Sequence, residues 1–282
     1  FWLKPFGPRC RGRPSPPPRG GMASERILIW GNLCVDNVFD VRAYPKEDTG
    51  QRALANHRAV GGNGGNTTRV LARLLGQRGR VSWIGPVPRS DEPDTAFALG
   101  ELRAAGVDVS LLEEVGGESL PSSFILRSQE TGSRTIVSAR QGVRELSASH
   151  LGEAVGRAFA EAASRGAPAW CHLECRLELG AMLGMAEAWR AHALSHDPAP
   201  PLSLEVEKPS LGTDGLVPLM QLCRHVLFSR DFVEANLSAL EAAAGAAGFT
   251  GAGSGDAPPW AQHPAMRFLR ALRACAAAAS GG

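Results

Sequence analysis

Short β-rich runs alternate with helical stretches along most of this chain, and that alternation restricts the fold more than any other feature. The runs are 27–31, 81–85, 168–174, 202–207 and 225–229. Strands separated by helices need crossover connections, which are right-handed, and they build a parallel sheet covered by helices on both faces. The sequence therefore predicts an α/β fold. Its helices are expected over 65–75, 92–105, 147–164, 177–193, 214–223 and 230–247.

Two regions, 34–60 and about 109–140, depart from this alternation. Extended segments such as VDNVFDV, SSFILRS and SRTIVSA follow one another there without helices. Such runs are typical of antiparallel strands, and we expect them to stand off the main sheet as a small second layer. Open α/β sheets bind ligands at the carboxyl ends of their strands, so this layer is expected to be a lid over that edge.

The charge and cysteine content narrows the choice of partners. Lys and Arg number 30 against 28 Asp and Glu, a formal net charge of +2, which argues against nucleic acid as a partner. No apolar run reaches the roughly 18 residues that a membrane span requires, so no membrane partner is expected. The six cysteines are scattered and follow no secretory signal, which indicates a reducing compartment rather than a disulfide framework.

Both ends of the sequence carry unusual composition. Residues 1–21 precede the first methionine and contain five basic residues, no acidic residue and many prolines. We expect residues 1–24 to be an unstructured leader or a sequence artefact, with the protein in the cytoplasm. The alternative is the remnant of a transit peptide for a plastid or mitochondrion. Near the other end, 243–257 is predicted to be an exposed Ala/Gly insertion, and 267–280 an amphipathic helix.

A glycine- and asparagine-rich loop, GGNGGN at 61–66, lies directly before a predicted helix. Glycines let the backbone approach a ligand closely, and asparagine side chains both donate and accept, which suits a polyhydroxylated ligand. A plain turn with a helix cap explains the same residues equally well. No Gly-Lys dipeptide occurs, which excludes a P-loop, and Thr67 replaces the third glycine of a dinucleotide fingerprint, which disfavours an oxidoreductase.

The segment CHLEC at 171–175 contains three residue types that bind zinc. On a strand, however, residues four apart are separated by about 13 Å, too far for one zinc ion with bonds of about 2.3 Å. No metal site is therefore expected there. The chain also lacks H-E-x-x-H and G-x-S-x-G motifs, so hydrolase chemistry has no support.

Several of these segments together resemble the PfkB/ribokinase family of sugar kinases, and within it most closely the ketohexokinase (fructokinase) branch. The resemblance covers roughly residues 26–282 in unbroken order. It is carried by GNLCVDNVFDVRAYPKEDTG, GGNGGN, ETGSRTI, WCHLECR and SLEVEKP, and by SRD at 229–231. The helix after GGNGGN has one residue more than is usual in the family.

The resemblance implies a fold, an activity and cofactors. The fold is a ribokinase-like, three-layer Rossmann-type sheet with a small β-stranded lid, over residues 25–282. The activity is transfer of the γ-phosphoryl group of ATP, with Mg²⁺, to a hydroxyl of a ketohexose, as in the conversion of fructose to fructose 1-phosphate. A homodimer formed through the lid strands is implied by the ketohexokinase resemblance alone.

The resemblance also assigns sugar-binding residues. Asp36 matches the family's sugar-binding aspartate, whose carboxylate accepts hydrogen bonds from two adjacent hydroxyls, although taken alone it reads equally as a turn residue. The sugar loop is matched by Gly62, Asn63 and Asn66. Glu174 and Arg176, near the carboxyl end of a predicted strand, are expected on the substrate side of the same cleft.

Four further residues are expected to serve the nucleotide. Arg134 matches a basic residue that reaches the phosphates of ATP. Glu205, Glu207 and Lys208 lie near another strand's carboxyl end. Because the two glutamates are two residues apart on a predicted strand, we expect them to share a face and to line the cleft or hold magnesium through water. A solvated strand end is the alternative.

The family's catalytic base lies in a D-T-x-G-A-G-D motif, next to helix amides that hold the phosphoryl oxygens. The segment at 251–256, GAGSGD, differs from it: Phe249-Thr250 replaces Asp-Thr, two residues intrude before Asp256, and prolines follow. We therefore expect the base beyond residue 282, with negligible kinase activity and low stability for the chain as written. The alternative is a non-catalytic family member that binds a sugar or a partner.

Overall fold

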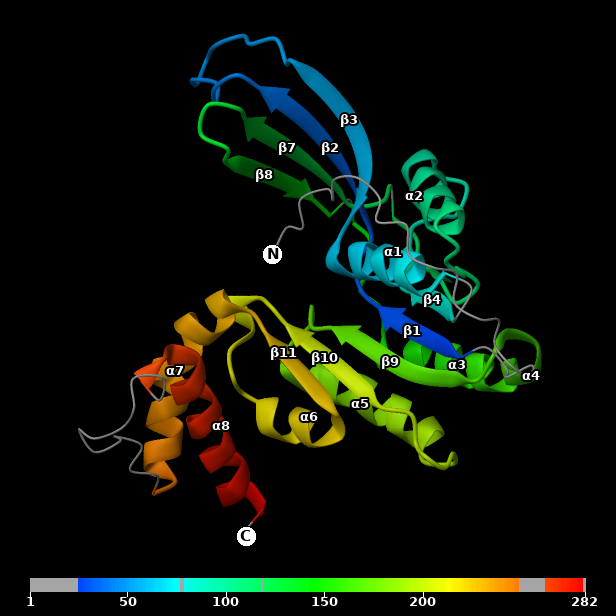
Figure 1. Cartoon of the computed structure of the whole chain (residues 1–282), viewed down its shortest axis with the longest axis vertical. Coiled ribbons are helices and arrows are strands. Elements are labelled where there is room, and N and C mark those ends of the chain that lie inside the picture. Colours follow the sequence, from blue (N-terminus) through cyan, green and yellow to red (C-terminus); the bar gives the residue numbers. More distant parts are fainter. Residues whose placement is uncertain (1–24, 77–78, 118, 141, 249–261, 281–282) are drawn as a thin grey trace, which may run out of the picture.

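The computed structural model describes residues 25–76, 79–117, 119–140, 142–248 and 262–280. Its centre is a five-stranded parallel sheet with the strand order β11-β10-β9-β1-β4 (Figure 1). The strands are β1 (Arg26–Trp30), β4 (Arg80–Ile84), β9 (Pro168–Glu174), β10 (Leu202–Val206) and β11 (His225–Phe228). The predicted α/β fold with a parallel sheet is confirmed, and each strand lies within one or two residues of its predicted bounds.

Helices lie on both sides of the sheet, with α1 and α2 on one side and α3, α5 and α6 on the other (Figure 1). Their bounds are α1 (Asn63–Leu75), α2 (Pro93–Ala104), α3 (Ala148–Ala160), α4 (Ala162–Arg165), α5 (Leu179–Ala193), α6 (Leu216–Leu222), α7 (Arg230–Ala246) and α8 (Pro264–Ser280), with a short 3-10 helix at Pro209–Leu211. The single helix predicted over 147–164 is wrong in one respect. It breaks at Glu161, whose carboxylate forms ion pairs with Arg26 and Arg165.

Strand β1 divides the apolar core into two clusters. Leu28 and Trp30 contact the cluster that includes α3 and α5, whereas Ile29 points into the cluster formed with α1 and α2. Alternate residues of a strand face opposite sides of its sheet, so one buried strand supplies both cores. The carboxyl end of β1 is thereby held rigidly where the chain turns toward the lid.

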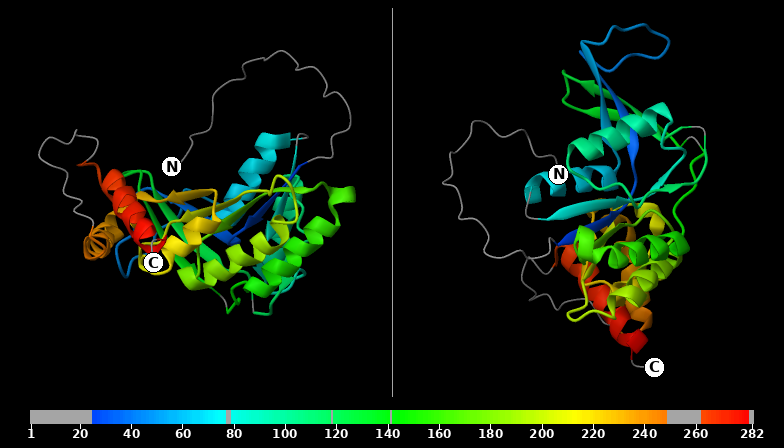
Figure 2. Two further views of the ribbon diagram at one scale, coloured as in Figure 1. Left: turned by 90° about the horizontal axis from the view of Figure 1, so that it is seen from below. Right: turned by 90° about the vertical axis from the view of Figure 1, so that its right-hand side faces the viewer.

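The lid is a separate four-stranded sheet that stands off the body (Figures 1 and 2). Its strands are β2 (Cys34–Val41), β3 (Ala55–Gly61), β7 (Ser122–Ser128) and β8 (Arg134–Ala139), in the order β3-β2-β7-β8. The hairpins β2/β3 and β7/β8 are antiparallel as predicted, but the central pair β2/β7 is parallel. Both strands leave the body in the same direction, which makes these neighbours parallel.

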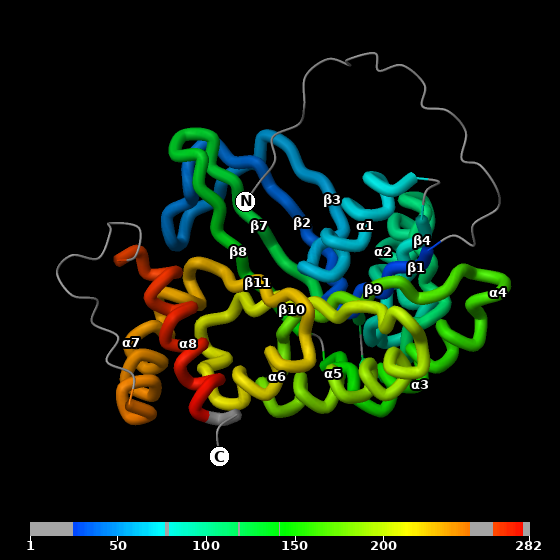
Figure 3. Tube along the Cα trace, turned by 60° about the horizontal axis from the view of Figure 1, so that its bottom comes forward, coloured from blue at the N-terminus to red at the C-terminus, as the bar shows by residue number. Residues whose placement is uncertain are grey.

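Three details differ from expectation or extend it. A two-stranded sheet of β5 (Pro86–Val87) and β6 (Glu113–Glu114) was not predicted. Helix α8 confirms the predicted amphipathic helix, begins at Pro264 and packs along α7 (Figure 3). Helix α7 extends to Ala246, so the first residues of the segment 243–257 are helical, whereas 249–257 and 1–24 lie outside the described residues.

Among the described helices, none combines the length and apolar composition needed to cross a lipid bilayer.

Candidate functional site

The glycine-rich loop joins the lid to the body at the carboxyl end of β1. Its second half forms the first turn of α1, which begins at Asn63 rather than at the predicted residue 65. Gly62, the N-cap, has φ of 84°, a conformation that glycine adopts readily and other residues avoid. A Cβ at Gly64 would overlap the backbone of Gly31. The helix start is thus pressed against the turn that follows β1, and the amide of Gly65 donates to the carbonyl of Asn32 at 2.9 Å.

Asp36 lies on the lid strand β2, between Ala59 of β3 and Ser123 of β7. A Cβ at Gly61 would overlap its half-buried carboxylate, so the carboxylate lies directly against the end of β3. The thiol of Cys34 donates to Asp36 Oδ1 at 3.6 Å. Burial raises the pKa of Asp36, although the Cys34 thiol, Ser123 and the charge of Arg134 act to lower it.

Glu174, the last residue of β9, lies against the glycine-rich loop at 61–66. Its side chain is almost fully buried, and its Oε2 accepts from the amide of Asn32 at 2.6 Å and from the amide of Gly64 at 3.0 Å. Its Oε1 forms an ion pair with Arg176 Nη1 at 3.5 Å. Burial raises the pKa of Glu174, opposed by the charge of Arg176 and by the two amides. Its contacts are therefore to the backbone that shapes the loop.

Of the residues expected on the nucleotide side, Arg134 begins the lid strand β8, whereas Glu205, Glu207 and Lys208 lie in or directly after β10. Glu207 follows the end of β10 and accepts a hydrogen bond from the side chain of Asn63. Glu205 lies within β10, with its Oε2 3.8 Å from Nε2 of His172. Strand β10 ends at Val206, so Glu205 lies within the strand and Glu207 directly after it. Within the described ranges, no group of three or more His, Cys, Asp or Glu side chains is placed to hold a metal ion.

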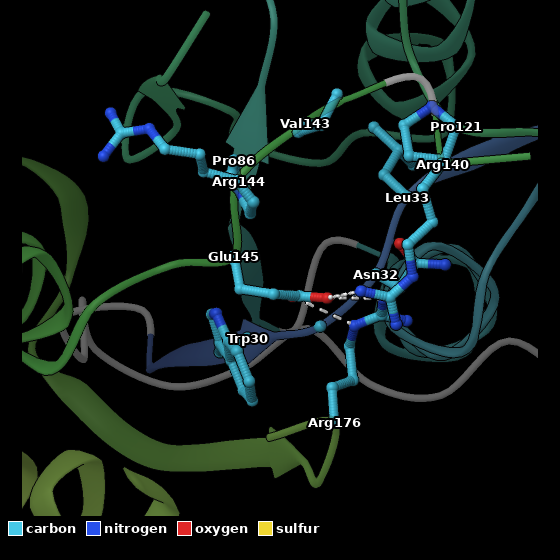
Figure 4. Close-up of a pocket in the computed structure, with 11 residues that line it drawn as sticks. Trp30, Asn32, Leu33, Pro86, Pro121, Arg140, Val143, Arg144, Glu145 and Arg176 are labelled. Carbon is cyan, nitrogen blue, oxygen red and sulfur yellow. Dashed lines mark hydrogen bonds and ion pairs between the residues drawn. The ribbon is translucent and has the colours of Figure 1, made fainter. Parts of the chain in front are cut away.

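A cavity beside the glycine-rich loop is lined in part by a residue that the sequence analysis missed, Glu145 (Figure 4). Glu145 lies between β8 and α3, and accepts from Arg140 at 2.9 Å and from Arg176 at 2.9 and 3.3 Å. Burial opposes its ionisation, but the hydrogen bonds and charge of Arg176 hold the pKa of Glu145 below its ordinary value. The cavity is lined by Trp30, Gly31, Asn32, Leu33, Pro86, Pro121, Arg140, Val143, Arg144, Glu145 and Arg176.

The predicted substrate-side residues are therefore brought to one place. Asp36, the loop Gly62–Asn66, Glu174 and Arg176 surround the carboxyl end of β1, beneath the lid. Together with the parallel sheet, this arrangement defines the class: an α/β domain with a β-stranded lid at the carboxyl ends of its strands, the edge where such sheets bind ligands.

Comparison with known proteins identifies the family. Residues 25–165 match the family described as pfkB family carbohydrate kinase, and the chain belongs to that family. It is 29% identical over 191 residues to the ketohexokinase of Mus musculus, which covers 67% of this chain and 59% of the relative. The chain thus spans about three fifths of the length of that relative. The resemblance inferred from the motifs is confirmed.

Solved structures confirm the ribokinase-like fold. The ribokinase of Cryptococcus neoformans var. grubii serotype A, solved with ADP, matches with a TM-score of 0.54 and 18% identity, covering 88% of this chain and 67% of that one. The ribokinase of Arabidopsis thaliana, solved with ribose and ATP, matches with a TM-score of 0.55 and 15% identity, covering 76% and 63%. At such identities the likeness concerns the fold alone.

Proposed function

We propose that this chain carries the sugar-binding part of an ATP-dependent kinase that phosphorylates a hydroxyl of a ketohexose, converting fructose to fructose 1-phosphate. One observation carries the proposal: the Asp36 carboxylate lies against Gly61, immediately before the loop that contains Asn63 and Asn66. A carboxylate next to two carboxamides offers both acceptors and donors to adjacent hydroxyls. The similarity to ketohexokinase supports a ketohexose as the substrate.

Each residue has a distinct part in this proposal. Asp36 accepts hydrogen bonds from sugar hydroxyls, Asn63 and Asn66 orient the ring, and Gly62 admits it close to the backbone. Behind the loop, the positive charge of Arg176 opposes the rise in the pKa of Glu174 that burial causes. No general base is assigned among the described residues.

ATP and Mg²⁺ belong to the proposal as cosubstrate and companion ion. Arg134 and Lys208 carry positive charge on the lid and at the sheet edge, and they are the proposed contacts for phosphate oxygens. Glu205 and Glu207 offer carboxylate oxygens that suit Mg²⁺ through water. The ion would neutralise charge on the transferring phosphoryl group. We also propose the cytoplasm as the compartment, because the five described cysteines are free thiols, as is usual in reducing surroundings.

Sugar affinity gives the direct test. Fructose, ribose and adenosine are titrated calorimetrically into the chain and into its Asp36→Asn variant. Binding of fructose should weaken about tenfold or more in the variant, because hydrogen bonds to charged groups contribute roughly 1.5–3 kcal/mol. Asp91→Asn is the matched control, since Asp91 is exposed and pairs only with its neighbour Arg89 among its described contacts. The absence of any sugar binding to the unchanged chain would reject the proposal.

Phosphoryl transfer is tested separately on the complete gene product. Release of ADP from Mg-ATP is measured with a panel of pentoses, hexoses and nucleosides. Fructose-dependent ADP release supports the kinase. Fructose binding without ADP release for any sugar would instead favour a family member that binds without catalysis.

A further inference from the structure

Three charged residues form a continuous chain of contacts, here called the relay, from the segment after the lid to the sugar loop. Glu145 contacts Arg176, Arg176 contacts Glu174, and Glu174 accepts the amides of Asn32 and Gly64. In Figure 4 the Glu145 carboxylate points toward the guanidinium groups of Arg140 and Arg176, beside Asn32. Residues far apart in the sequence thus converge directly behind the loop.

The two oxygens of Glu174 have separate partners. Oε1 faces Arg176 Nη1 at 3.5 Å, whereas Oε2 accepts both backbone amides, at 2.6 and 3.0 Å. A Cβ at Gly31 would overlap Oε2, so this oxygen lies directly against the turn that follows β1. The position of the first turn of α1 depends on Oε2 remaining available to Gly64.

The N–H groups of the Arg176 guanidinium also have separate partners. Its Nε and Nη2 donate to Glu145 at 3.3 and 2.9 Å, which leaves Nη1 for Glu174. A guanidinium prefers a bidentate contact with a carboxylate, using two parallel N–H groups on two oxygens. Without Glu145, Arg176 would be drawn into that contact with Glu174, in competition with the amides of Asn32 and Gly64.

We propose that Glu145 is a positioning residue for the sugar loop: by occupying two N–H groups of Arg176, it reserves Glu174 Oε2 for the amides of Asn32 and Gly64. The inference rests on the proposed function in one respect, because it takes the loop to be the sugar-binding loop. Glu145 itself lies behind the loop and acts through Arg176 and Glu174.

Arg140 supplies a matched control. It donates to the same carboxylate at 2.9 Å, but its side chain is 63% exposed and no described contact joins it to Glu174. Arg140→Gln therefore removes a charge next to Glu145 and leaves the contact between Glu145 and Arg176 in place. A general loss of charge in the cavity would affect both variants, whereas the relay predicts an effect of Glu145→Gln alone.

The experiment combines amide NMR with fructose titration. Chains labelled with ¹⁵N at glycine and asparagine are compared as the unchanged protein, Glu145→Gln, Glu145→Gln/Arg176→Lys and Arg140→Gln, each with its melting temperature measured. In Glu145→Gln the amide protons of Asn32 and Gly64 should move upfield, and fructose should bind about tenfold more weakly, as expected within a coupled network. Lysine keeps the charge but cannot make the bidentate contact, so the double variant should return the amide shifts of Asn32 and Gly64 toward those of the unchanged protein.

Each outcome decides the proposal. Unchanged amide shifts in Glu145→Gln overturn it, as does equal disturbance in the double variant or in Arg140→Gln. If the unchanged protein binds no fructose, the proposed function fails, and the amide shifts alone still decide whether Glu145 positions the loop.

Discussion

Asp36 is a carboxyl group whose ionisation is opposed by burial and supported by a thiol. Burial raises the pKa of Asp36, while the Cys34 thiol and Ser123 oppose that rise. The thiol remains a protonated donor, because burial raises the pKa of Cys34 to about 12. An ionised carboxylate is the stronger acceptor for sugar hydroxyls. Fructose affinity should therefore fall as the pH drops through the raised pKa of Asp36, above its ordinary value near 3.8.

We predict that Cys34→Ala moves this midpoint to higher pH. The substitution removes one donor to the carboxylate, so the ionised form loses support and the pKa of Asp36 rises further. Cys34→Ser retains a donor and should keep the midpoint close to that of the unchanged protein. Calorimetric titration of fructose between about pH 4 and pH 7 measures both, spanning the ordinary range of a carboxyl group and above it. A midpoint that stays in place in Cys34→Ala would contradict the role given to the thiol.

Arg26 is a fully buried guanidinium at the start of β1, and its charge is balanced by two side chains. It donates to Ser82 at 2.7 Å and to Asp108 at 2.6 Å, and pairs with Glu161 at 3.4 Å. Arg26→Met should lower the free energy of unfolding by about 1–3 kcal/mol, because the part-buried carboxylate of Asp108 loses its closest charged partner and keeps Arg165 near the surface. Urea denaturation measures the change. Arg165→Gln is the control: Arg165 pairs with the same Asp108 near the surface, and its loss should cost under about 1 kcal/mol.

At the scale of elements, the sequence pattern predicts those strands and helices whose position depends on neighbouring residues in the chain. The five central strands and the helices follow from runs of residues that are contiguous in the sequence. The break between α3 and α4 does not, because it accompanies an ion pair of Glu161 with Arg26, 135 residues away. The parallel pairing of β2 with β7 depends on the direction in which two separate hairpins leave the body. The pair β5/β6 has only two residues in each strand, too short for any alternation to appear.

The same distinction holds for the candidate site: residues in contiguous motifs could be predicted, whereas residues that depend on distant contacts could not. Asp36 and the loop Gly62–Asn66 lie in contiguous motifs, so the sequence alone could point to them. Glu145 could not be found in this way, because its partner Arg176 lies 31 residues further along the chain and the segment around it has no pattern of its own. Glu205 and Glu207 lie at the end of β10, and their contacts with His172 and Asn63 come from other segments of the chain, which the spacing of the two glutamates does not reveal.

At the end of β3, Gly61 packs against Asp36 of the neighbouring strand β2, and this contact can be tested by substitution. Gly61→Ala should weaken fructose binding about tenfold and lower the free energy of unfolding by roughly 1–3 kcal/mol, because the added methyl group would overlap the Asp36 carboxylate. Gly100→Ala in α2 is the control. No atom lies within 4 Å of its added Cβ, and alanine within a helix should stabilise the protein by about 0.5–1 kcal/mol. Normal fructose affinity in Gly61→Ala would contradict the placement of Asp36 against this glycine.

For the whole molecule, the outer face of the lid carries exposed apolar side chains. Phe39 and Phe124 stack there with their ring centroids 6.5 Å apart, and Val137 lies opposite Phe124 on the neighbouring strand. Phe124 is 56% exposed and Val137 66% exposed. Strand β8 is also an edge strand of the lid sheet, the position at which a further strand can pair. Exposed apolar side chains next to the edge strand β8 support the homodimer through the lid that the family resemblance implies.

We predict that the chain sediments as a dimer and that Val137→Lys shifts it to the monomer. A lysine on an edge strand opposes pairing with another strand, because its charge would have to leave water. Sedimentation equilibrium measures the dissociation constant, which should rise at least tenfold in the variant, a change of about 1.4 kcal/mol. Leu74→Lys on α1 is the matched control, since Leu74 is equally apolar and 75% exposed but lies on the body. A monomeric unchanged chain, or equal weakening by Leu74→Lys, would exclude the lid as the dimer interface.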